Sequence, residues 1–269
     1  MEIITTQLIF IAIFILMIHS IETLAYAVRL SGARVGLLAS ALSLFNILVM
    51  VSRMANMAQQ PFTGNLLDEA PQDGGAFLET QFRFIIGAST VGTLVGILLL
   101  PTFIALFSRA IIHLTEVNGS VGALFKKGFT EGYFRRSLNY IRLPKRKDWQ
   151  EIEWKDAPYR LFFINIFITA IYTIGVLSAL YAALLMPSHS ATATMASGLI
   201  NGVATILLII FIDPKISVMA DSVIRGKGRY NQLKTASIFM ITSRLIGTLV
   251  AQLLFIPGAK YIAWFTTLL

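Results

Sequence analysis

Residues 160–185 read RLFFINIFITAIYTIGVLSALYAALL, a run in which Arg160 carries the only charge. About 20 apolar residues in a helix are enough to cross the roughly 30 Å hydrocarbon core of a bilayer. Five more such runs occur, at residues 4–27, 35–57, 84–107, 194–213 and 234–256. Of the 269 residues, 56% are hydrophobic and only 13% are charged, against about 25% charged in ordinary soluble domains. The sequence therefore predicts an all-α polytopic membrane protein with six transmembrane helices.

Basic residues are concentrated in the connections that would lie on one side of the membrane. Most of the 22 Lys and Arg fall in the 109–160 and 214–234 connections, and Arg29 and Arg34 follow the first run. The 58–82 connection, on the opposite side, is acidic. Cytoplasmic loops are enriched in Lys and Arg. We therefore expect both termini outside the cell, with the 109–160 and 214–234 connections in the cytoplasm.

The two halves of the chain share a weak internal repeat. FIAIFI at 10–15 is echoed by FINIFI at 163–168, and GTLV at 92–95 recurs at 247–250. Two spans lie between the members of each pair, so the two halves would have opposite orientations in the membrane. Inverted repeats are typical of alternating-access transporters, although a duplication could also serve only to build a stable six-helix bundle. The expected organisation is a three-helix membrane half (1–108), a cytoplasmic amphipathic connection (109–159) and a second three-helix membrane half (160–269).

Ionisable side chains occur inside the predicted spans. His19 and Glu22 lie in the first span, Arg53 in the second and Arg244 in the middle of the last. A charged side chain near the bilayer centre costs about 2.5–3.5 kcal/mol even on insertion scales, so such residues usually face a hydrated interior and have a function. The excess of arginine predicts a polar cavity suited to an anion. The alternative is a purely structural ion pair of Glu22 with Arg53 or Arg244.

On several predicted spans, polar side chains follow one another at a spacing of three, four or seven residues. Residues at this spacing share one face of a helix. Glu22 is the only carboxylate expected in the core, so two guanidinium groups would leave a net positive charge for a substrate. Asp213-Pro214 is interpreted as the end of the fifth span and not as part of a site. The residues expected to contact the substrate are Arg53, Arg244, Arg29, Arg34, His19, Glu22, Asn46, Asn201 and Gln252.

Aromatic and basic residues alternate in the long connection. This pattern is typical of an amphipathic helix on the membrane surface, and such a surface attracts anionic membrane lipids. The positive-inside rule alone also explains the charge, so the net charge of +8 does not indicate a nucleic-acid partner. The residues that form the pattern are Phe125, Lys126, Lys127, Phe129, Tyr133, Phe134, Arg135 and Arg136, with Trp149 and Trp154 as interfacial anchors.

Motifs for common enzymatic chemistry are absent from the sequence. The chain has no cysteine, which excludes disulfides, thiol catalysis and cysteine-ligated metals. It lacks the phosphate-loop pattern G-x-x-x-x-G-K-[ST] and the H-E-x-x-H and G-x-S-x-G patterns. We expect a transporter without ATP hydrolysis, cofactor or metal.

Two stretches resemble a known family. HSIETLAYAVRLSGAR at 19–34 and NILVMVSR at 46–53, which leads to Gln60-Pro61, resemble the Amj family, the alternate lipid II flippases of bacterial peptidoglycan synthesis. The resemblance extends over the whole chain in length and hydropathy. It implies movement of an undecaprenyl-pyrophosphate-linked peptidoglycan precursor from the inner to the outer leaflet of the cell membrane. Two alternatives stay open: transport of another anionic polyprenyl lipid or solute, and a non-transporting membrane enzyme or assembly factor.

The predicted topology can be tested by cysteine labelling, since the chain has no native cysteine. Gln72→Cys should react with a membrane-impermeant maleimide in intact cells. Arg146→Cys should react only after the membrane is permeabilised. Labelling of position 146 but not of position 72 from outside would reverse the assignment.

Overall fold

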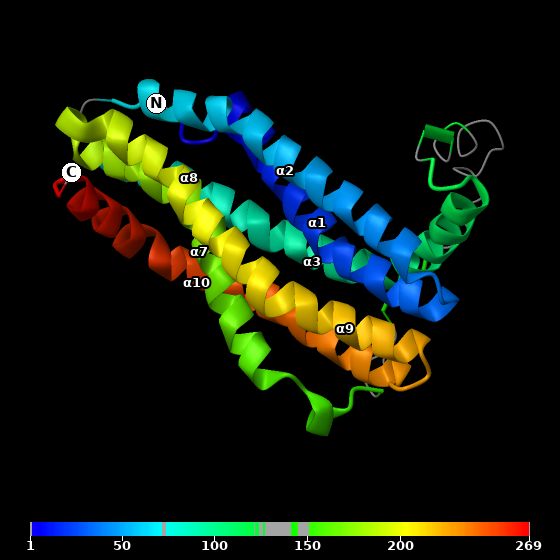
Figure 1. The fold of residues 1–269 in the computed structure, drawn as a ribbon. Helices are drawn as coiled ribbons and strands as arrows, with labels where there is room; N and C mark the ends of the chain where they lie inside the picture. Colours follow the sequence, from blue (N-terminus) through cyan, green and yellow to red (C-terminus); the bar gives the residue numbers. More distant parts are fainter. Residues whose placement is uncertain are drawn as a thin grey trace.

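The computed structural model describes residues 2–71, 74–120, 122, 123, 126, 141–144 and 151–268. Throughout these residues the regular structure is helical, and six helical segments are long and apolar enough to cross a membrane. The segments lie side by side, with both termini at the same end of the bundle (Figure 1). The predicted fold class is confirmed. The spans are α1 (Thr6–Val35), α2 (Leu38–Asp68), α3 (Gly75–Glu116), α7 (Tyr159–Leu185), the Pro187–Ile224 segment and α10 (Tyr230–Thr266).

The ends of α1 illustrate how local sequence sets the helix limits. Thr5 caps its first turn by accepting a hydrogen bond from the Leu8 N–H at 3.1 Å. At the other end, Gly36 adopts the left-handed conformation with φ 74°, which costs glycine little. The chain reverses there within two residues, so α1 and α2 pack as an antiparallel pair.

The fifth span does not end at Asp213-Pro214, so that interpretation of the sequence is wrong. After η3 (Pro187–His189), α8 (Ser190–Leu207) runs into a π-helical turn, η4 (Leu208–Ile212), and then into α9 (Asp213–Ile224). Pro214 falls in the first turn of α9, where proline removes no bond that the helix needs. The predicted 214–234 connection is therefore helical as far as Ile224.

The same pairing of helices occurs in both halves. α1 packs along α3, and α7 packs along α10. Gly92 on α3 lies directly against the backbone of Leu16, while Gly247 on α10 lies against the Ile166 carbonyl and Thr169 of α7. Small residues at such positions allow helix backbones to approach closely. A symmetric relation of the halves about an axis in the membrane plane stays a prediction.

α1, α7 and α10 form the interior of the bundle, and α2 and α8 lie at its edge. Half or slightly more of the most apolar window of each interior helix is buried, compared with 22% in α3, 17% in α2 and 11% in the Pro187–Ile224 segment. α2 and α8 expose large apolar side chains such as Met54 and Leu199, as expected for helices that face lipid. The space between these edge helices and the interior is where the polar residues gather.

The close approach at Gly92 predicts a position-specific loss of stability. A Cβ at this position would meet the Leu16 backbone, so Gly92→Ala should lower the free energy of unfolding by about 1–3 kcal/mol. Gly87→Ala is the matched control, because it lies on the same helix with open space around it. Thermal unfolding in detergent micelles measures both, and equal melting temperatures would contradict the packing.

Candidate functional site

A cavity of about 640 Å³, counting the space at its open mouth, lies between α1, α2, α7, α8 and α10. We call it the arginine cavity, because three guanidinium groups line it. Its walls come from both halves of the chain. Its polar and charged lining residues are Glu22, Tyr26, Arg29, Arg53, Thr169, Tyr172, Thr205, Asp213 and Arg244.

Glu22 joins three helices at the base of this cavity. It accepts a hydrogen bond from Arg244 Nη2 of α10 at 2.5 Å and another from Ser52 Oγ of α2 at 3.0 Å. The Arg244 and Glu22 side chains are only 8% and 14% exposed. Because each charge would be costly without the other, this pair fixes α1, α2 and α10 relative to one another. Of the two ion pairs considered from the sequence, the structure contains the one with Arg244.

A second ion pair lies at the other end of the cavity. Arg29 Nη2 donates to Asp213 Oδ1 at 2.8 Å, and the Arg29 side chain is 3% exposed. The Phe45 ring stacks on this guanidinium, with 4.0 Å from Cζ to the ring centroid, a favourable cation–π contact. Asp213 is thus a second carboxylate in the cavity, and the expectation that Glu22 would be the only one is wrong. The π turn carries the helix past Asp213 and places this carboxylate beside α1.

Arg53 is the third arginine, and it differs from the other two. It lines the cavity from α2 with an exposed side chain. Among the described residues it has no hydrogen-bond or ion-pair partner. Three guanidinium groups and two carboxylates leave one positive charge uncompensated in the arginine cavity.

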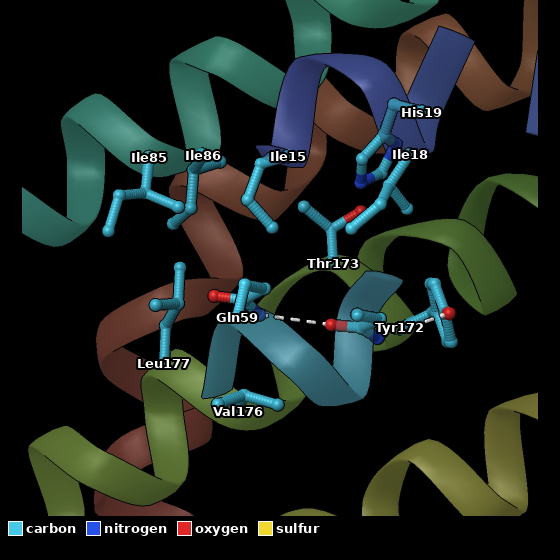
Figure 2. Close-up of a pocket in the computed structure, with 11 residues that line it drawn as sticks. Ile15, Ile18, His19, Gln59, Ile85, Ile86, Tyr172, Thr173, Val176 and Leu177 are labelled. Carbon is cyan, nitrogen blue, oxygen red and sulfur yellow. Dashed lines mark hydrogen bonds between the residues drawn. The ribbon is translucent and has the colours of Figure 1, made fainter. Parts of the chain in front are cut away.

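A second, smaller cavity lies between α1, α2, α3 and α7 (Figure 2). His19 is 3% exposed there, and its Nδ1 has no partner among the described residues. We call this second cavity the histidine cavity. The Tyr172 hydroxyl accepts a bond from Asn56 Nδ2 at 3.3 Å, and Gln59 Nε2 donates to Asn56 Oδ1 at 3.0 Å. Tyr172 lines both cavities, so it lies at the boundary between a charged compartment and an uncharged polar one.

Four of the residues expected to contact substrate line neither cavity. Arg34 and Asn46 are exposed on α1 and α2. Asn201 packs against Gly175 where α8 meets α7. Gln252 donates to the Arg83 carbonyl at 2.9 Å and its own carbonyl accepts from Arg83 Nη1 at 2.8 Å, which clamps α3 to α10. The spacing of polar residues along a helix shows which of them share a face. It does not show which neighbouring helix that face packs against.

The basic connection is described only in part. Residues 121, 124, 125, 127–140 and 145–150 lie outside the described residues, so the amphipathic surface helix and the anchor Trp149 stay predictions. The described segment before α7 is bound to the start of α10 by Arg229, whose Nη2 lies 2.9 Å from Glu153 and 2.7 Å from Asp156. A hydrogen bond from Gln232, together with these neighbours, lowers the pKa of the Asp156 carboxyl.

Six apolar helical segments, five of which line a cavity with an excess of positive charge, define a multi-pass membrane protein. The Amj family model, described as "Alternate to MurJ", matches residues 14–266, and the chain belongs to this family. It is also 62% identical over 266 residues to the lipid II flippase Amj of Bacillus subtilis (strain 168), with 99% of each chain covered. No solved structure matches. The resemblance seen at 19–34 and 46–61 is confirmed.

The buried pair predicts a strong coupling between Glu22 and Arg244. Arg244→Met would leave the Glu22 carboxylate without its partner and should cost about 3–5 kcal/mol of stability. Adding Glu22→Gln to this variant should restore part of the lost stability. Arg225→Met, which breaks an ion pair whose side chains are 66% and 37% exposed, should cost about 0–1 kcal/mol. Melting temperatures of the wild type, Arg244→Met, Glu22→Gln, the double variant and Arg225→Met test this, and additive effects at positions 22 and 244 would exclude the coupling.

Proposed function

We propose that this protein is a lipid II flippase, which moves the undecaprenyl-pyrophosphate-linked peptidoglycan precursor from the inner to the outer leaflet. The observation that carries this proposal is the uncompensated cationic cavity inside the membrane of a protein 62% identical to a lipid II flippase. The lipid's sugar-peptide head cannot cross hydrocarbon unaided. A polar path through the bundle removes that barrier. The name of this Bacillus subtilis relative, a flippase, describes a transporter and not an enzyme.

The pyrophosphate is the part of the substrate that the arginine cavity suits. Phosphate oxygens form short, charge-assisted and often bidentate hydrogen bonds with arginine. Arg53 would meet the anion first, because its guanidinium has no partner among the described residues and is exposed. Arg29 and Arg244 line the deeper wall, with Glu22 and His19 adjusting the charge around them.

The position of the cavity favours a lipid over a soluble anion. α2 forms one wall and α8 another, and these two edge helices make few contacts with each other. A polyprenyl tail can stay in the bilayer between them while the head group enters. An inside-negative membrane potential would favour outward movement of the anionic head group by about 2.3 kcal/mol per negative charge per 100 mV. Transport then requires no ATP hydrolysis.

Substitution of the cavity arginines tests the proposal in proteoliposomes that contain fluorescent lipid II. Arg53→Ala removes charge, and Arg244→Lys keeps charge but loses the planar fork. A charge-assisted bond contributes about 1.5–3 kcal/mol, so each variant should slow initial flipping by about 10–100-fold. Arg225→Ala, an exposed arginine outside the cavity, should flip at the normal rate.

The variants must first be shown to insert and fold, by monodisperse elution and an unchanged helical circular dichroism spectrum. If folded Arg53→Ala and Arg244→Lys proteins moved lipid II at the wild-type rate, the arginine cavity would not be the binding site.

A further inference from the structure

Both buried arginines of the arginine cavity are paired through a single nitrogen. Arg244 uses Nη2 for Glu22, and Arg29 uses Nη2 for Asp213. Their Nε–H groups are buried and have no acceptor among the described residues. A guanidinium can make two parallel hydrogen bonds to one anionic group, and a buried donor without an acceptor is unfavourable. The two ion pairs therefore leave donors that a larger anion could satisfy.

A pyrophosphate is a better match for these two guanidinium groups than the carboxylates that now pair with them through Nη2 alone. It carries negative charge on both phosphates and offers more acceptor oxygens than a carboxylate. The cavity already has one positive charge in excess, on Arg53. An anion attracted by Arg53 that binds Arg244 through two nitrogens would compete with Glu22 for Nη2.

We infer that Glu22 holds the place of the substrate's pyrophosphate on Arg244 in the unliganded protein, and that the lipid displaces it on binding. This inference rests on the proposed function and specifies how the same site is controlled. The displaced carboxylate remains close to His19, three residues earlier on α1 and thus on the same helix face. The His19 ring is buried and has an unpartnered nitrogen, so it can donate an N–H to that carboxylate.

Displacement of Glu22 would also open the boundary between the two cavities. Glu22 accepts bonds from Ser52 of α2 and from Arg244 of α10, and it lies on α1 one turn from His19 of the histidine cavity. When Arg244 turns to the pyrophosphate, the junction of α1, α2 and α10 loses its central contact. Binding of the correct head group is thereby coupled to release of α2.

The first test measures affinity with the full-length protein in nanodiscs. Glu22→Gln keeps the shape of the side chain and an acceptor for Ser52 but removes the competing charge. If the carboxylate occupies Arg244 about nine-tenths of the time, Glu22→Gln should lower the Kd for undecaprenyl diphosphate about tenfold. Flipping should be slower, because release from the unopposed arginine is slower. Glu79→Gln is the matched control, because Glu79 pairs with Arg83 outside both cavities, and its Kd should not change.

The outcomes separate the inference from the proposed function. Undecaprenol, which lacks the diphosphate, is the reference ligand. If the wild-type protein bound undecaprenyl diphosphate no better than undecaprenol, the proposed function would fail. If the wild type discriminated between them but folded Glu22→Gln bound undecaprenyl diphosphate no more tightly, only the displacement of Glu22 would be overturned.

A second measurement does not depend on folding of the Glu22 variant. Ser52 is fully buried against Glu22, and the chain has no native cysteine. The Ser52→Cys variant should react faster with a membrane-permeant maleimide when undecaprenyl diphosphate is bound than when undecaprenol is present, because the diphosphate frees α2. An equal or slower rate with the diphosphate would contradict the inference.

Discussion

A guanidinium in hydrocarbon is tolerable only beside water or an acceptor, and this constraint organises the bundle. Arg244 of α10 needs Glu22 of α1, and Arg29 of α1 needs Asp213 of α9. Each of these ion pairs joins the first half of the chain to the second. At the cavity the halves are thus joined by ion pairs. Away from it they share one apolar core, in which Phe82 of α3 meets Phe255 of α10, and glycines let α1 approach α3 and α7 approach α10 within each half. In the proposed mechanism, a charged ligand would compete for the ion pairs and not for the apolar core.

The sequence alone predicts the six spans and the class of protein, because length and hydropathy determine both. It also narrows the partner of Glu22 to two arginines. It does not predict that Asp213 belongs to the cavity, since Pro214 next to it is typical of a helix boundary and hides the π turn. Arg53 and Arg244 both line the arginine cavity, whereas Gln252 meets Arg83 and Asn201 meets Gly175. Those contacts depend on how the helices pack across the bundle. The spacing of residues within one helix carries no information about that packing.

The edge helices are held differently from the interior ones. α1 with α3 and α7 with α10 meet at glycines, where the backbones touch and little adjustment is available. α2 and α8 bury far less of their length. In the proposed mechanism, a head group larger than the arginine cavity would gain space from movement of α2 or α8, which are the least buried spans. Arg53 would move with α2, which keeps the unpaired charge at the entrance.

Because of the π turn at Leu208–Ile212, the number of residues in the fifth span cannot change without a structural consequence. A π turn closes i→i+5 bonds, so it holds one more residue than the α-helical turn it replaces. Loss of that residue would rotate everything after it by about 100° and turn Asp213 away from Arg29. Substitutions in this stretch leave the register intact, whereas a single deletion does not. Among related sequences, residues 190–224 should therefore vary in composition while insertions and deletions are selected against.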